Sequence, residues 1–291
     1  MYYKSRGYRI FNLFNLIFLL VCGVICVLPL FHILAVSLSS KGAADANMVN
    51  FIPVEFTWDA YEETLENDRF FRAFMISVQR TVVGTAFGMF IMTMAAYPLS
   101  KSSKVFKGRT FLAWFFVFTL FFGGGLIPSY ILILKLGLMN SFWALIIPGA
   151  VSVWSVVLLM NFFRTVPKEM EDAALIDGAG DFRALFSIYL PVSMPAIATL
   201  SLFSIVGAWN SWFDGMIYMK DADKYPLATF MQSIVVKTDF SLITSGSSLD
   251  NISQRTVKAA QIFIGILPIL LVYPFMQKYF VKGIVVGAVK E

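Results

Sequence analysis

Six long apolar stretches, separated by short polar segments, dominate this sequence. They cover residues 10–38, 74–99, 110–134, 142–163, 195–219 and 257–280. A helix needs about 20 predominantly apolar residues to cross the hydrocarbon of a bilayer. Each stretch is long enough, so the pattern predicts an all-α integral membrane protein with six transmembrane helices. We treat residues 1–291 as a single membrane domain.

The third stretch is the least regular of the six. Three consecutive glycines, Gly123 to Gly125, and then Pro128 interrupt it. A membrane tolerates such a break only where neighbouring groups satisfy the freed backbone polar atoms. We therefore expect this span to kink or unwind near residue 124.

The composition agrees with a protein that faces lipid. Of the 291 residues, 58% are hydrophobic and 14% are charged, whereas soluble domains carry about 25% charged residues. The net charge of +5 does not indicate nucleic-acid binding, because the basic residues form short clusters between apolar stretches. Cys22 and Cys26 both lie in the first stretch and form neither a disulfide framework nor a metal site. That stretch is also too long for the apolar core of a signal peptide, so we expect a retained span.

The distribution of basic residues predicts the orientation. Lys and Arg accumulate in the cytoplasmic loops of membrane proteins. One set of loops is rich in them, whereas the loop of residues 41–68 on the opposite side carries mostly acids and the loop of residues 220–256 is mixed. Both termini are therefore expected on the cytoplasmic side, together with the basic residues Lys4, Arg6, Arg9, Lys101, Lys104, Lys107, Arg109, Arg164, Lys168, Arg183, Lys278, Lys282 and Lys290.

The predicted cytoplasmic loop of residues 164–194 has the pattern of two short helices joined by a turn. Pro167 suits the first position of a helix, and acids follow in the first turns, where the helix dipole favours them. Gly178 and Gly180 predict the end of that helix, and Asp181 is a suitable N-cap for the next. From these residues alone, an amphipathic connector lying on the membrane surface explains the pattern equally well.

The same loop resembles the EAA loop of permeases from ABC importers. The family pattern is E-A-A, three residues, G, nine residues and I-x-L-P. Here it matches Asp172-Ala173-Ala174, Gly178, Ile188, Leu190 and Pro191, with Asp172 replacing the usual Glu. The resemblance implies that the loop docks on an ATP-binding subunit through Glu171, Asp172, Ala173, Ala174, Asp177, Gly178, Ile188, Leu190 and Pro191.

The resemblance extends over essentially the whole chain, to the binding-protein-dependent, MalG-like permeases of carbohydrate uptake and their LplC/YtcP-like group. Segments that carry it include residues 96–100, 124–130, 136–140, 209–213 and 271–275. It implies the six-helix permease fold of type I ABC importers, in a bacterial inner membrane. The implied partners are a second permease subunit, two ATP-binding subunits and an extracytoplasmic sugar-binding protein. The implied cargo is a carbohydrate, an oligosaccharide by the group's assignment.

The resemblance also implies that this chain is not an enzyme and binds no cofactor, since ATP and Mg²⁺ belong to the ATP-binding subunit. An ABC permease for a non-sugar solute is the first alternative. The second is an ion-coupled secondary transporter, which would place acids or histidines inside its spans, and these spans hold almost none. A membrane enzyme would need paired carboxylates, a Ser/His set or metal ligands, which are missing.

A few polar or aromatic residues in or near the spans are candidates for other roles. Trp209, Asn210, Trp212 and Asp214 combine aromatic faces with polar groups, as a sugar path requires, although an interfacial aromatic belt explains the tryptophans equally well. We expect His32 to pack or to form a hydrogen bond to a neighbouring helix. Arg80 is expected to extend its charged end to the membrane surface, with a role in the transport path as the alternative. The apolar tail of residues 282–291 is expected to contact the ATP-binding subunits.

Overall fold

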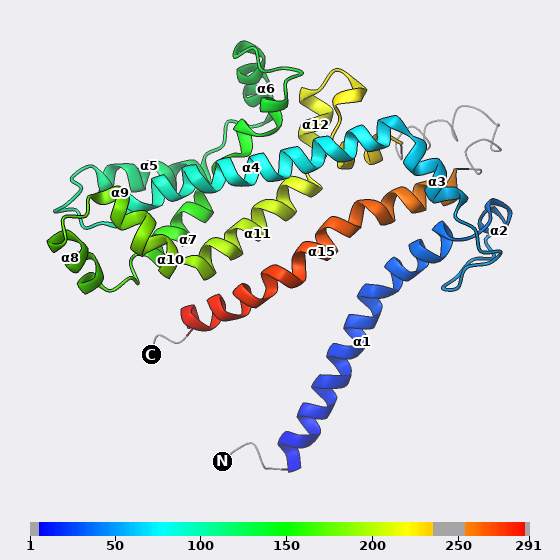
Figure 1. Cartoon of the computed structure of the whole chain (residues 1–291), viewed down its shortest axis with the longest axis horizontal. Helices are drawn as coiled ribbons and strands as arrows, with labels where there is room; N and C mark the ends of the chain where they lie inside the picture. Colours follow the sequence, from blue (N-terminus) through cyan, green and yellow to red (C-terminus); the bar gives the residue numbers. More distant parts are fainter. Residues whose placement is uncertain (1–5, 235–253, 289–291) are drawn as a thin grey trace. The chain divides into compact units, whose positions relative to one another are not determined.

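The computed structural model describes residues 6–234 and 254–288, and every regular element in them is helical (Figure 1). The chain divides into two compact units. The first comprises Met1–Phe70 and Ile234–Leu267, and the second comprises Phe71–Ser233 and Pro268–Glu291. The prediction for the C-terminal tail concerns side chains outside those that the structure describes.

The first unit combines one long helix with short helices. It contains α1 (Arg6–Ser37), α2 (Lys41–Asp45), α3 (Asp59–Glu66) and the beginning of α15 (Arg255–Ala288). Ser40 caps α2 by accepting a hydrogen bond from the amide of Ala43. Arg255 donates to the carbonyl of Ala44 at 2.9 Å, so α2 and the start of α15 are fastened together. The apolar residues in the first two thirds of α1 are exposed within the chain, as expected of a helix that faces lipid.

The second unit is a helical bundle that surrounds one apolar core. Its helices are α4 (Asp68–Ser100), α5 (Arg109–Phe121), α6 (Leu126–Lys135), α7 (Val153–Phe163), α11 (Met194–Asn210) and α12 (Phe213–Tyr218). The core joins α4, α7, α11 and the segment before α11, and its most deeply buried large side chains are Met92, Leu159, Phe163 and Leu185. Helices in a membrane associate through close van der Waals packing of such side chains, so this cluster fixes how α4, α7 and α11 pack.

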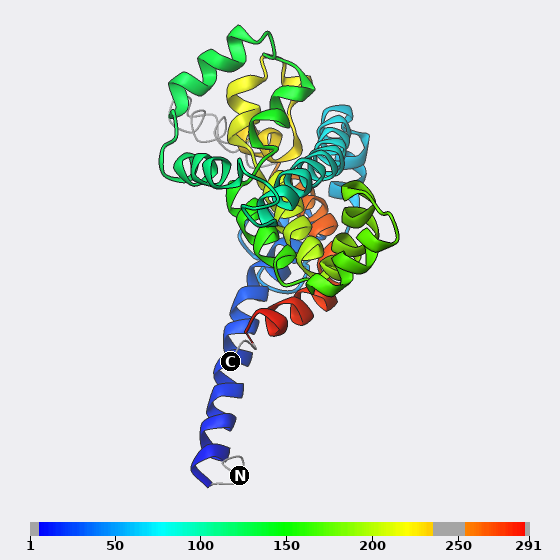
Figure 2. The ribbon, with the colours of Figure 1, turned by 90° about the vertical axis from the view of Figure 1, so that its left-hand side faces the viewer.

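The described residues contain three single helices that are long and apolar enough to cross a membrane: α1, α4 and Arg255–Phe275 of α15. Three further helix pairs meet the same requirement only when each pair is taken together, with bends of 116°, 52° and 82°. The largest bend separates α5 from α6, which turns away from it (Figure 2). The break lies at residues 122–125, so the predicted interruption of the third stretch is confirmed.

The fourth and fifth stretches also differ from continuous helices. The fourth begins with two 3-10 turns, Phe142–Leu145 and Ile147–Gly149, before α7 starts at Val153. The fifth stops at Asn210, and α12 restarts at Phe213. Pro148 lies inside the second 3-10 turn, where regular α-helical hydrogen bonding stops because proline lacks an N–H. Residues 150–152 separate this turn from α7.

Candidate functional site

The loop that carries the EAA-like pattern folds as α8 (Lys168–Ile176), a tight turn, and α9 (Asp181–Ala184). Gly178 has φ +73°, the left-handed conformation that glycine adopts without steric cost. Its amide donates to the carbonyl of Leu175 at 3.0 Å, and the amide of Ala179 donates to the carbonyl of Ala174 at 2.8 Å. These two bonds form a complete Schellman motif. The predicted glycine stop is confirmed, although Pro167 precedes the first helical residue instead of occupying that position.

The prediction that Asp181 is an N-cap was wrong. Gly180 occupies the cap position and α9 begins at Asp181, whose carboxylate accepts a hydrogen bond from the hydroxyl of Tyr97 at 3.4 Å. A π-helical turn (Leu185–Tyr189) and a short helix α10 (Leu190–Val192) then lead to α11. Ile188 and Leu190 pack against the bundle core, so the distal half of the pattern anchors the loop.

Glu171 points toward the bundle, where Lys101 meets it. The ammonium of Lys101 donates to the carboxylate of Glu171 and, at 3.0 Å, to the hydroxyl of Tyr189, which itself donates to Glu171 at 2.6 Å. The same ammonium lies 4.3 Å from the ring centroids of both Tyr97 and Tyr189. Burial alone would raise the pKa of Glu171, but the hydrogen bonds from Lys101 and Tyr189 and the charge of Lys101 lower it. This cluster therefore fastens α8 to the end of α4.

Most other residues of the pattern on α8 are exposed. Asp172, Ala173 and Asp177 are exposed, and Ala174 is half-buried. Apolar side chains accompany them: Ile176 is 86% exposed and Phe182 on α9 is 72% exposed. Pro191 is exposed as well, at the start of the last turn before α11. The α8–α9 hairpin thus presents acidic and apolar groups together, with no described part of the chain covering them.

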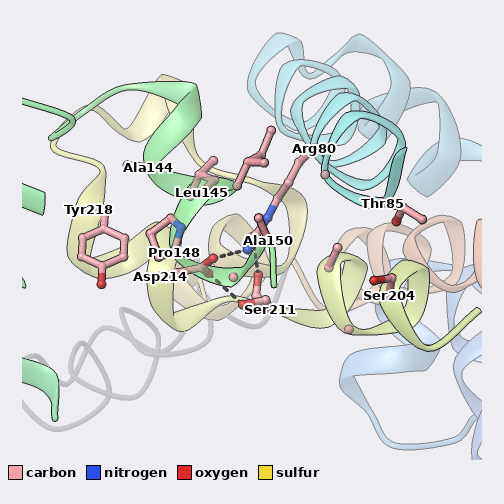
Figure 3. Close-up of a pocket in the computed structure, with 15 residues that line it drawn as sticks. Arg80, Thr85, Ala144, Leu145, Pro148, Ala150, Ser204, Ser211, Asp214 and Tyr218 are labelled. Carbon is pink, nitrogen blue, oxygen red and sulfur yellow. Dashed lines mark hydrogen bonds and ion pairs between the residues drawn. The ribbon is translucent and has the colours of Figure 1, made fainter. Parts of the chain in front are cut away.

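A second polar centre lies inside the bundle, where Arg80 of α4 meets Asp214 of α12 (Figure 3). The expectation that Arg80 extends to the membrane surface was wrong, since this residue is only 5% exposed. Its guanidinium forms an ion pair with Asp214 and donates to the carbonyl of Ser211 at 3.0 Å. The second carboxylate oxygen of Asp214 accepts from the Ser211 hydroxyl and the Gly215 amide, each at 2.9 Å. A buried arginine needs such a paired and hydrogen-bonded partner.

This ion pair forms part of the wall of a cavity of about 420 Å³. α4, the 3-10 turns after Ser141, α11 and α12 contribute its lining (Figure 3). The polar residues of the lining are Arg80, Thr85, Ser204, Ser211, Asp214 and Tyr218, and several glycines and alanines supply the remaining space. A cavity of this size with a few convergent polar groups has the character of a small-molecule site.

The structure does not bring the four predicted sugar-path residues together. Trp209 is 8% exposed and packs edge-to-face on Phe74, with 5.7 Å between ring centroids. Asn210 and Trp212 are exposed, and only Asp214 lines the cavity of Figure 3. Sequence reasoning missed Lys101 and assigned Arg80 to the surface, because only the fold reveals the acidic partner of each.

His32 is half-buried and makes its hydrogen bond to a loop. Its Nδ1 lies 2.6 Å from the carbonyl oxygen of Asn50. No cluster of three or more His, Cys, Asp and Glu side chains with the spacing of a metal site occurs among the residues that the structure describes.

Known proteins resemble this chain over nearly its full length, although no family model matches it. The polygalacturonan/rhamnogalacturonan transport system permease protein YtcP of Bacillus subtilis (strain 168) is 39% identical over 287 residues, which are 97% of this chain and 99% of that protein. Protein LplC of the same organism is 37% identical over 290 residues, which are 99% of this chain and 97% of LplC.

A solved structure agrees with these relatives. A chain in the crystal structure of a bacterial ABC transporter involved in the import of the acidic polysaccharide alginate superimposes with a TM-score of 0.84 and 29% identity, covering 95% of this chain and 99% of that chain. The sequence relatives and the structural neighbour agree on one kind of membrane protein. This chain belongs to the MalG-like family of permease subunits of carbohydrate ABC transporters.

Proposed function

We propose that this chain forms half of the translocation pore of an ATP-driven importer for an oligosaccharide. In this assembly a second permease supplies the other half, two ATP-binding subunits supply the energy, and an extracytoplasmic binding protein delivers the sugar. The family membership supports the assignment to carbohydrate import. The exposed hairpin of α8 and α9 is the observation that carries the proposed mechanism, because it offers a contact surface that is firmly fastened to the bundle.

In the proposed mechanism, α8 is the coupling helix that docks on an ATP-binding subunit. The exposed Ile176 and Phe182 provide apolar contact, and Asp172 provides a charge at the open face. Glu171 is bound to Lys101 at the end of α4, so a displacement of α8 acts directly on that helix. In this mechanism Glu171 holds α8 to the end of α4, and the exposed Asp172 lies at the edge of the docking surface.

The proposed topology has six spans with both termini in the cytoplasm. It takes one span from each of the six apolar stretches, and residues 181–192 of the third bent pair belong to the cytoplasmic loop. Cysteine labelling tests it after Cys22 and Cys26 have been replaced by serine. A cysteine at Ser102 should react only with reagents that reach the cytoplasm and one at Met48 only from outside, and the reverse pattern would contradict the topology.

We also infer that the sugar passes the cavity beside Arg80 and Asp214. The ion pair is internally neutral, and the free hydroxyls of the lining can donate or accept hydrogen bonds, as sugar hydroxyl groups require. Trp212, which is 38% exposed beside this region, offers an aromatic face. Alanine replacements at Ser204 and Thr85 should weaken sugar-dependent uptake while ATP binding by the partner subunits stays unchanged.

The test of the coupling role compares two glycines in the same turn. Valine at Gly178 would be forced into the left-handed region, whereas Gly180 has φ −75° and open space around its Cα. The transporter should therefore lose uptake with Gly178→Val but retain it with Gly180→Val, with both proteins inserted in the membrane. Normal uptake with Gly178→Val would contradict the coupling role of this turn.

A further inference from the structure

A second polar cavity of about 420 Å³ lies where α4, α5, α7 and α8 end or begin. Four cationic side chains and two carboxylates line it: Lys101, Arg109, Arg164, Lys168, Glu171 and Asp172. It shares no lining residue with the cavity of Figure 3. Its positive charge is not explained by the transport mechanism described so far.

Two arginines converge at the end of α4. Nε of Arg109 donates to the carbonyl of Leu99 at 2.9 Å, and Nη2 of Arg164 donates to the same oxygen at 3.3 Å. These bonds cap the last turn of α4 and hold the two guanidinium groups close together. Among the described residues, neither guanidinium forms an ion pair with a carboxylate.

The charge around this cavity remains positive after its internal pairs are counted. Glu171 is bound to Lys101, so that pair is neutral. Arg109, Arg164 and Lys168 then face a single remaining acid, Asp172. Guanidinium groups present parallel N–H donors that match the oxygen atoms of a phosphate. The cavity therefore favours an anion with several oxygen atoms.

The cavity lies at a membrane boundary. The apolar stretches of residues 74–99, 110–134 and 142–163 end or begin directly beside Lys101, Arg109 and Arg164. Three helix ends thus place these cations at the level of the lipid headgroups. One turn along α5, Phe111 is 76% and Trp114 is 69% exposed, which provides apolar surface for acyl chains beside the cavity.

We propose that this cavity binds the phosphate of an anionic phospholipid. Basic pockets between the cytoplasmic ends of transmembrane helices bind such headgroups. A phosphate that bridges Arg109, Arg164 and Lys168 ties the beginning of α5 to the end of α7 and to the beginning of α8. The lipid thereby stabilises the base of the bundle from which the hairpin of α8 and α9 projects.

Native mass spectrometry of the full-length chain, purified in detergent, tests this proposal. Phosphatidylglycerol is compared with phosphatidylcholine of the same acyl chains and with inorganic phosphate. Wild-type protein should retain phosphatidylglycerol at least about tenfold more tightly than either. The choline of phosphatidylcholine adds a cation beside an already cationic cavity, and inorganic phosphate lacks the acyl chains that pack on the apolar surface. Equal affinity for phosphatidylcholine, or displacement of the lipid by inorganic phosphate at comparable concentration, would overturn the assignment to a lipid.

Variants locate the site. The double variant Arg109→Gln/Arg164→Gln should lose the preference for phosphatidylglycerol. The control Lys104→Gln/Lys107→Gln removes the same charge from the loop before Arg109, outside the cavity, and should keep the preference. Arg109→Lys/Arg164→Lys retains the charge and should keep most of the binding, which controls for misfolding. An equal loss of phosphatidylglycerol binding in Arg109→Gln/Arg164→Gln and in Lys104→Gln/Lys107→Gln would overturn the site. Normal lipid binding in the glutamine variant would overturn the site as well.

Discussion

The ammonium of Lys101 and the carboxylate of Glu171 are joined across 70 residues of sequence, and that contact fastens α8 to the end of α4. Only 8% of the Lys101 side chain and 23% of the Glu171 side chain are exposed. The rings of Tyr97 and Tyr189 enclose the cation. Glu171 immediately precedes the EAA-like triplet, so the pattern and its anchor are adjacent on one helix.

Removing the cation should destabilise the bundle. Lys101→Met leaves Glu171 with only the hydroxyl of Tyr189 as a partner, and we expect a loss of about 2–3 kcal/mol in the free energy of unfolding. Thermal unfolding in detergent measures it, with Lys104→Met, an exposed lysine of the same loop, as the control. In a double-mutant cycle, Lys101→Met and Glu171→Met together should cost less than the sum of the two. Strict additivity would contradict the contact.

The same contact predicts a dependence of stability on pH. The folded protein holds the pKa of Glu171 below the ordinary value of 4.5. The carboxylate therefore contributes stability that is complete above pH 4.5 and is lost as the pH falls through the lower folded pKa. Comparing wild type with Glu171→Gln in thermal unfolding from pH 7 to pH 3 isolates this contribution. The difference in unfolding temperature between the two proteins should narrow only below about pH 4.5. A difference that does not change with pH would contradict the shifted pKa.

Much of the helical architecture could be predicted from the sequence. Length and hydropathy locate the six apolar stretches, and Gly123–Gly125 locate the break between α5 and α6, because both signals are local. The size of the bends was not predictable. It depends on how α6 and α12 pack against their neighbours, and no local pattern in the fifth stretch marks the interruption at Ser211 and Trp212.

The glycine turn of the hairpin could be anticipated from the sequence, whereas the two buried ion pairs could not. The turn at Gly178 follows from a glycine at the end of a helical pattern, and the structure has it there. Arg80 and Asp214 lie 134 positions apart, and Lys101 and Glu171 lie 70 apart. Their pairing arises only when α4 packs against the later helices. An arginine within a predicted span was itself a signal for a buried acidic partner, which the surface interpretation overlooked.

Substitution of the buried pair of Arg80 and Asp214 should lower stability far more than substitution of an exposed pair whose arginine also lies on α4. Arg80→Gln leaves a carboxylate without its cation inside the bundle, and we expect a loss of about 3–5 kcal/mol. Arg72 lies 3.6 Å from Asp223, with both side chains 55% exposed, so Arg72→Gln should cost less than about 1 kcal/mol. Thermal unfolding of both variants provides the comparison. A similarly small loss of stability in Arg80→Gln and Arg72→Gln would show that Asp214 does not hold Arg80.

Gly215 tests the packing next to that pair. A Cβ at this position would lie 2.2 Å from Oγ1 of Thr229 and 3.0 Å from Cδ of Pro226. Gly215→Ala should therefore displace Thr229 from the carbonyl of Trp212, to which it donates at 2.7 Å, at a cost of about 1–3 kcal/mol.

The control for Gly215 is another glycine near the cavity. Gly207 has no atom within 4 Å of its added Cβ, and it lies inside α11. Gly207→Ala should be neutral or stabilise the helix by up to about 1 kcal/mol. If Gly215→Ala lowers the free energy of unfolding no more than Gly207→Ala does, the close approach of α12 to Thr229 is not present in the folded protein.

Uptake of labelled oligosaccharide into proteoliposomes tests whether this chain transports sugar only as a subunit of an ATP-driven importer. The transporter is purified through a tag on this chain together with its co-purifying subunits, and the chain alone is reconstituted in parallel. We predict uptake by the complete assembly that requires ATP and the binding protein, and none by the chain alone under any ion gradient. Ion-driven uptake by the purified chain alone would contradict the account.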